Sequence, residues 1–209
     1  MTERPFIILG GGGHARVVAS TLRQLNQTIL GLTDPREKAS LGKEIEHLGG
    51  DKILEDYAPT EVALAVGVGS SRDTTRHAHL FDEKRGDNFD FPSLIHPDAF
   101  VAPEAYVGLG TQVMAGAVVQ PGTTLAENVI VNTNASIDHD CEIARHVHVA
   151  PGATISGHVS LDRRVHVGTG ASIVQGVHVG ARSVVGAGAV VVNDVPPESI
   201  VVGVPARPK

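Results

Sequence analysis

Residues 113–149 read VMAGAVVQPGTTLAENVIVNTNASIDHDCEIARHVHV, with an aliphatic residue at every sixth position. The same spacing continues in both directions without an insertion, over Ile95, Val101, Val107, Val113, Val119, Leu125, Val131, Ile137, Ile143, Val149, Ile155, Leu161, Val167, Ile173, Val179, Val185 and Val191. Neither the 3.6-residue period of a helix nor the two-residue period of a strand produces this pattern. A fixed period of this kind indicates a repeat architecture.

The position four residues after each aliphatic residue is small or β-branched, as at Ala117, Ala135 and Ala153. We interpret each hexapeptide as a short strand and a corner, with the aliphatic residue inward and the small residue near the bend. Glycine tolerates the backbone of tight corners, and it recurs at Gly110, Gly116, Gly122, Gly152, Gly170 and Gly188. Coils about 4.8 Å apart would hydrogen-bond to one another. The pattern therefore predicts an all-β parallel β-helix.

Composition narrows the class of protein. Net charge is −6, with no long basic run, so nucleic acid and anionic membranes are poor partners. Cys141 is the single cysteine, which excludes a disulfide within the chain and suits a reducing compartment. No stretch has the roughly 18 consecutive apolar residues of a membrane helix. We expect a soluble, cytoplasmic protein.

The first 91 residues have a different pattern. Strands are expected at 6–10, 28–32 and 61–66, and helices at 15–25 and 71–84, which predicts an α/β Rossmann-like βαβ domain. The loop Gly10-x-Gly12-x-x-Ala15, with Asp34 further on, satisfies a loose dinucleotide fingerprint. A complete dinucleotide site needs two such halves, and this segment supplies about one. Binding of a nucleotide portion by the loop and the helix N-terminus is therefore favoured over NAD.

The repeats resemble the hexapeptide-repeat acyltransferase superfamily, which implies a left-handed helix with three hexapeptides in each coil. The ending NDVPPE, residues 193–198, followed by VGVPAR, residues 202–207, looks like the closing segment of sugar acyltransferases in that group. We therefore expect a Rossmann-like nucleotide-sugar-binding domain at 1–91, a β-helix at 92–195 and a capping segment at 196–209.

Taken together, the Gly-rich domain, the connector FPSLIHP at 91–97 and the repeats resemble bacterial nucleotide-sugar N-acetyltransferases typified by PglD, a group that includes NeuD. The strongest local match is VNTNASIDHDCEI, residues 131–143, followed by His148. This resemblance implies acetyl transfer from acetyl-CoA to the 4-amino group of a UDP-linked amino sugar, without a metal. It places the catalytic base at His139 and the residue that raises its basicity at Asp140.

The resemblance also implies binding residues. Acetyl-CoA would lie in a groove between subunits of a homotrimer and contact His148, Gly157, Thr169 and Ala187. The nucleotide sugar would contact Gly12, Gly13, His14, Asp34, Gly67 and Asn132. The chain departs from the family at Thr33-Asp34, where two acidic residues are common.

The chemistry suits these residue types. A sugar amine that attacks a thioester must lose a proton, and imidazole accepts a proton near neutral pH. A carboxylate on the other ring nitrogen fixes the tautomer and stabilises the imidazolium. Adjacent side chains on a strand point to opposite faces, so Asp140 reaches His139 only if a corner redirects one of them. Asp138 is the alternative partner.

Other interpretations remain open at this stage. The same architecture hosts O-acetylation of a sialic-acid-type sugar, and it hosts trimeric γ-class carbonic anhydrase, which needs three histidines on a metal. A non-enzymatic scaffold with a nucleotide sensor is a third possibility. We expect His146, His158, His166 and His178 to be solvated. We expect Val118, Ile130, Val184 and Val190 to face outward and to form the trimer contact.

Overall fold

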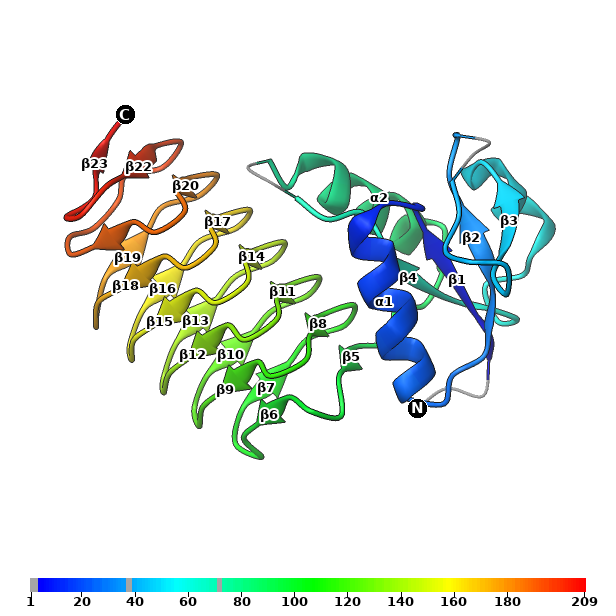
Figure 1. The fold of residues 1–209 in the computed structure, drawn as a ribbon, viewed down its shortest axis with the longest axis horizontal. Helices are drawn as coiled ribbons and strands as arrows, with labels where there is room; N and C mark the ends of the chain where they lie inside the picture. The colour runs from blue at the N-terminus through cyan, green and yellow to red at the C-terminus, as the bar shows by residue number, and fades with distance from the viewer. Residues whose placement is uncertain (1–3, 37–38, 71–72) are drawn as a thin grey trace. The chain divides into compact units, whose positions relative to one another are not determined.

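The computed structural model describes residues 4–36, 39–70 and 73–209 (Figure 1). The chain divides into two compact units, which we describe separately. The first unit comprises residues 1–69 and 76–94, and the second comprises residues 70–75 and 95–209. The main boundary follows Leu94, close to the boundary at residue 91 that the sequence suggests.

The first unit is a parallel sheet with the strand order β3-β2-β1-β4. Its elements are β1 (Phe6–Leu9), α1 (Gly13–Gln24), β2 (Ile29–Thr33), β3 (Glu46–Gly49), the 3-10 helix η1 (Asp51–Asp56), β4 (Ala63–Val66) and α2 (Thr75–Gly86). The central strand β1 and its neighbour β4 are buried along their whole length. Such continuous apolar runs are typical of parallel strands covered on both faces.

Sequence patterns miss β3 and η1. β3 reads EHLG, is only partly buried and lies at the edge of the sheet, so it lacks an apolar run. The expected helix at 71–84 is present as α2, although residues 71–72 lie outside the described part of the chain.

The second unit is a β-helix of short strands, mostly of two residues, in three sheets that are parallel except at β23 (Figure 1). Thr124 pairs with Glu142, and 142 − 124 gives 18 residues in each coil. The five-stranded sheet contains β7 (Tyr106–Val107), β10 (Thr124–Leu125), β13 (Glu142–Ile143), β16 (Ser160–Leu161) and β19 (His178–Val179). The six-stranded sheet contains β6 (Phe100–Val101), β9 (Val118–Val119), β12 (Ser136–Ile137), β15 (Thr154–Ile155), β18 (Ser172–Ile173) and β21 (Val190–Val191).

The eight-stranded sheet contains β5 (Leu94–Ile95), β8 (Gln112–Val113), β11 (Ile130–Val131), β14 (His148–Val149), β17 (His166–Val167), β20 (Val184–Val185), β22 (Ile200–Val202) and β23 (Arg207–Pro208). β22 pairs in parallel with β20, so the expected capping segment extends this sheet. β23 then lies antiparallel to β22 at the edge. The outermost strand is therefore the two-residue β23, and a very short edge strand is a poor template for a second chain.

The core of the β-helix is the predicted aliphatic ladder. From Val113 to Val191 its members are at most 1% exposed, and the small residues pack between them. Ile95 is 36% exposed, since it lies in the first strand of the stack. The corner glycines that the sequence indicates all have positive φ, for example 75° at Gly122.

The outward apolar residues only partly match the expectation. Val118, Val184 and Val190 are partly exposed, but Ile130 is 1% exposed and offers no free surface. In the described part of the chain, no helix has the length and apolar character needed to cross a membrane.

Candidate active site

The expected site residues occupy three places. His139, Asp140 and Gly157 lie at the corner between the six-stranded and five-stranded sheets. Asn132, His148, Thr169 and Ala187 line a groove beside the eight-stranded sheet. Gly12, Gly13, His14, Asp34 and Gly67 line a pocket in the first unit.

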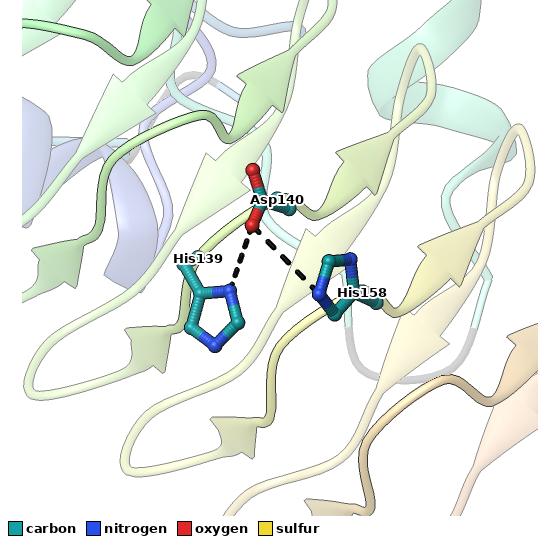
Figure 2. Close-up of side chains that lie close together, drawn as sticks. All are labelled: His139, Asp140 and His158. Carbon is teal, nitrogen blue, oxygen red and sulfur yellow. Dashed lines mark hydrogen bonds and ion pairs between the residues drawn. The ribbon is translucent and has the colours of Figure 1, made fainter.

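His139 and Asp140 form a hydrogen-bonded pair (Figure 2). His139 Nδ1 lies 2.8 Å from Asp140 Oδ2. Asp140 has φ +55°, a left-handed corner conformation that turns its side chain back towards the preceding residue. Asp138 instead accepts the backbone N–H of His139 at 2.8 Å. The carboxylate that pairs with the imidazole is therefore that of Asp140.

This pairing sets the chemistry of the imidazole. The hydrogen bond to Asp140 raises the pKa of His139, opposed by desolvation and assisted by the charges of Asp138 and Asp140. The neutral ring donates its Nδ1 hydrogen to Asp140, which leaves the lone pair on Nε2. The side chain is 46% exposed, so a substrate can reach it.

Gly157 makes room for this ring. A Cβ atom at position 157 would lie 2.6 Å from both Cε1 and Nε2 of His139. Gly157 is not among the residues with positive φ, so its small size matters here rather than its backbone freedom. Gly122, on the preceding coil, makes room for the carboxylate of Asp140 in the same way.

The groove, of about 520 Å³, has a polar wall built around His148. Asn132 Nδ2 lies 3.1 Å from His148 Nε2, and Ser70 Oγ lies 2.6 Å from His148 Nδ1 and 3.2 Å from His166 Nδ1. One orientation satisfies this chain, in which Asn132 donates to His148, His148 donates to Ser70, and Ser70 donates to His166. Burial lowers the pKa of His166, which keeps it neutral as an acceptor.

Two expectations about histidines are wrong. His166 and His146 are 5% and 6% exposed, not solvated, because each packs in a hydrogen-bonded cluster. His158 and His178 are exposed as expected, and each lies beside a carboxylate, Asp140 and Asp162 respectively. Ser70 was not predicted, since its contacts join positions 78 and 96 residues apart.

The rest of the groove is apolar and continues the same sheet, since Val184 pairs with His166 and Ile200 pairs with Val184. Val184, Ile200 and Val202 contribute side chains, and Thr169 and Ala187 follow β17 and β20 at the corner with the six-stranded sheet. Gly168 has no room for a side chain, because a Cβ atom would lie 2.6 Å from the backbone N of Ala187. The groove is thus a mainly apolar channel with a few fixed polar groups, as in many small-molecule sites.

In the first unit, the Gly-rich loop lines a pocket of about 230 Å³ with His14, Arg36 and Arg76. The loop follows β1 and leads into α1, whose N-terminus has no capping side chain. Uncapped N–H groups at a helix N-terminus bind anions such as phosphate. Gly67 packs tightly, as a Cβ atom there would lie 2.7 Å from Ile8 Cγ2 and 2.8 Å from Ala15 Cβ.

Asp34 anchors this pocket. It is 2% exposed and accepts the backbone N–H groups of Gly11 and Arg36, both at 2.9 Å. It also accepts Nε and Nη2 of the Arg36 guanidinium at 2.8 and 2.7 Å. Hydrogen bonds from Arg36 hold the pKa of Asp34 well below its usual range. The Asp34 carboxylate is therefore occupied by hydrogen bonds within the protein. Arg36, which the sequence does not predict, is an exposed charged group of the pocket, as is Arg76.

Comparisons with known proteins agree with this arrangement. Residues 5–79 match the family described as the PglD N-terminal domain. The acetyltransferase domain of PglB from Neisseria gonorrhoeae is 37% identical, with a TM-score of 0.93, over 99% of this chain and 100% of that one. PerB from Caulobacter crescentus, solved with CoA and GDP-perosamine, is 33% identical with a TM-score of 0.89, over 100% and 98% of the two chains. No curated protein sequence gives a significant match.

The likeness extends over both units. It confirms the Rossmann-like domain followed by a left-handed β-helix. The similar proteins are acetyltransferases or hold coenzyme A. The chain belongs to the PglD/NeuD-like family of hexapeptide-repeat sugar acetyltransferases.

Proposed function

We propose that this enzyme transfers the acetyl group of acetyl-CoA to the 4-amino group of a UDP-linked amino sugar, with His139 as general base. The main support is the His139–Asp140 pair, in which Nδ1 is bonded to the carboxylate and Nε2 keeps its lone pair on a half-exposed ring. The PglB domain has been solved with acetyl coenzyme A, and PerB with CoA and GDP-perosamine. The family assignment favours acetyl transfer over the carbonic anhydrase reaction.

The reaction needs one base and no covalent enzyme intermediate. The amine nitrogen attacks the thioester carbonyl, and His139 Nε2 accepts the proton that the nitrogen loses. The C–S bond then breaks, and the coenzyme thiolate leaves and takes the proton from the imidazolium. Asp140 stabilises the imidazolium through the hydrogen bond at Nδ1.

The positions of the residues favour a site shared between subunits. Thr169 and Ala187 lie at the corner where the chain enters the six-stranded sheet, and His139 lies at the corner where it leaves that sheet. Within one subunit, the groove and His139 are therefore separated by the width of the six-stranded sheet. A homotrimer would bring the groove of one subunit beside His139 of the next. We propose that acetyl-CoA lies there, against His148, Gly157, Thr169 and Ala187.

The nucleotide portion is assigned to the pocket of the first unit. Its Gly12-Gly13-His14 loop and the N-terminus of α1 suit a diphosphate, and Asp34 holds Arg36 beside them. Gly67 shapes the floor by close packing. Asn132, the remaining expected substrate contact, lies in the groove and donates a hydrogen bond to His148. We propose that it contacts the substrate and also orients the His148 ring.

Cys141 is free and buried, which suits a reducing compartment, and we propose a cytoplasmic enzyme.

The test of function is a panel of UDP-linked and GDP-linked amino sugars, assayed by release of the CoA thiol from acetyl-CoA. We expect turnover with a UDP-linked 4-amino sugar, and none with the sugar that has a hydroxyl at that carbon. If only GDP-linked sugars are turned over, the nucleotide of the substrate is GDP and not UDP. Turnover of the hydroxyl sugar alone would replace N-acetylation by O-acetylation.

A further inference from the structure

His158 has no part in the mechanism above, yet it lies beside the proposed base (Figure 2). Its Nε2 is 3.8 Å from Asp140 Oδ2, and its ring stands edge-on to His139 at 5.0 Å between centroids. Ligand atoms of His139, Asp140 and His158 all lie within 4.8 Å of one another. Two imidazoles and a carboxylate thus converge from adjacent coils on one exposed point.

The backbone fixes this convergence. Positions 140 and 158 are 158 − 140 = 18 residues apart, one coil, and both have left-handed φ values, +55° and +57°. The N–H of His158 also donates to the carbonyl of His139 at 3.0 Å. The three side chains therefore start from positions that stacked coils hold rigid, while their ends remain exposed and adjustable.

The donor set has the chemistry of a transition-metal site. Imidazole nitrogens favour zinc, copper and nickel, whereas magnesium and calcium prefer oxygen ligands. Zinc bonds of roughly 2.0–2.2 Å place tetrahedral ligands about 3.4 Å apart. Asp140 Oδ2 lies 2.8 Å from one nitrogen and 3.8 Å from the other, which brackets that separation. Small rotations of the half-exposed side chains of His139, Asp140 and His158 would bring their ligand atoms to bonding distance from one ion.

We propose that His139, Asp140 and His158 form a binding site for a divalent transition ion of the zinc type, and that occupancy of this site inhibits the enzyme. The inhibitory part rests on the proposed role of His139, whereas the binding part does not.

Inhibition follows from the tautomers of His139. As a base it keeps its hydrogen on Nδ1, bonded to Asp140, and its lone pair on Nε2. The ring nitrogen beside Asp140 is Nδ1, which must lose that hydrogen to bind an ion next to this carboxylate. The ion also takes the Asp140 carboxylate that supports the imidazolium. Metal binding and base catalysis therefore require opposite states of the same ring.

The test is calorimetric titration of the purified, metal-free full-length enzyme with zinc chloride. We expect one ion for each His139–Asp140–His158 set, and His158→Asn should weaken binding at least tenfold. Asparagine tolerates the left-handed backbone of position 158, as Asn134 does at its own corner, so the variant should fold. His178→Gln is the matched control, since His178 pairs with Asp162 at 3.2 Å but belongs to no three-residue cluster in the described chain.

Zinc binding that is absent from the wild type, or unchanged in His158→Asn, overturns the site. Inhibition is measured separately, by CoA release with and without zinc. Wild type and His178→Gln should lose activity and regain it with a chelator, whereas His158→Asn should resist zinc. Zinc that binds without inhibiting would overturn the inhibitory role alone. An enzyme that binds zinc but never transfers acetyl would instead refute the proposed function.

Discussion

Replacing Gly157 by alanine should impair catalysis without damaging the fold. The new Cβ atom would lie 2.6 Å from Cε1 and Nε2 of His139, whereas carbon atoms in contact are about 3.5–4.0 Å apart. The imidazole must therefore move by about 1 Å. A displacement of that size from a productive geometry can cost about 10²-fold in rate. The ring can move because it is the exposed end of a flexible side chain, so the coil itself need not shift.

The assay is kcat from CoA release, with the thermal unfolding temperature measured on the same samples. We expect Gly157→Ala to lose about 10²-fold in kcat while its unfolding free energy changes by less than about 1 kcal/mol. Gly168→Ala is the contrasting variant, since its Cβ would meet backbone atoms of the next coil, and overpacking costs about 1–3 kcal/mol. Full kcat in Gly157→Ala would refute the reasoning. A rise in KM for acetyl-CoA with kcat unchanged would make Gly157 a coenzyme contact only.

Three further predictions follow from the same geometry. Asp140→Asn should lower kcat less than loss of His139 and should move the rising limb of the rate–pH profile to lower pH, because Asp140 raises the pKa of His139; an unmoved limb would contradict this pairing. Light scattering at micromolar concentration should give about three times the 21.8 kDa chain mass, and a fully active monomer would refute the shared site. A fragment that begins at Pro92 should fold, since solenoid coils are stabilised by their neighbours, and calorimetry should show that it retains CoA binding and loses the nucleotide sugar; unchanged sugar binding would move that site to the β-helix.

The β-helix could be predicted almost completely from the sequence, because its signal is strictly periodic. Val113, Val131 and Val149 lie 18 residues apart, stack in register and are fully buried. Once the period is known, the position of every coil follows from the numbering. The strand β3 lacks such a signal, since EHLG at a sheet edge has neither a period nor an apolar run.

The candidate site could be predicted only in part. The residue types at His139 and Asp140 suggest a base and its partner, but their pairing depends on the left-handed backbone of Asp140. That position lies in the six-residue register of the corner residues Gly116 and Gly122, a signal that the choice between Asp138 and Asp140 did not use. Arg36 and Ser70 were missed for different reasons. Arg36 can be recognised as a pocket residue only from its ion pair with Asp34 in the folded domain. Ser70 contacts His148, which lies 78 residues further along the chain, so local sequence patterns do not reveal the contact.

The burial of His166 was also beyond sequence reasoning. His166 and His178 both precede an inward aliphatic residue of the repeat, which gives no reason to treat them differently. In the structure His166 is 5% exposed beside His148, whereas the His178 side chain is 50% exposed beside Asp162. Which outward position is covered depends on tertiary packing, which a repeat of six residues does not encode.

The most direct test of the central claim is the dependence of kcat on pH in the wild type and in His139→Ala. The wild-type rate should rise through a pKa above the usual 6.5 of histidine, since Asp140 stabilises the charged ring. His139→Ala should lower kcat by about 10²–10⁴ and should lose that limb, while any titration of the sugar ammonium itself remains. If His139→Ala retains most of the wild-type kcat with the same limb, His139 is not the base.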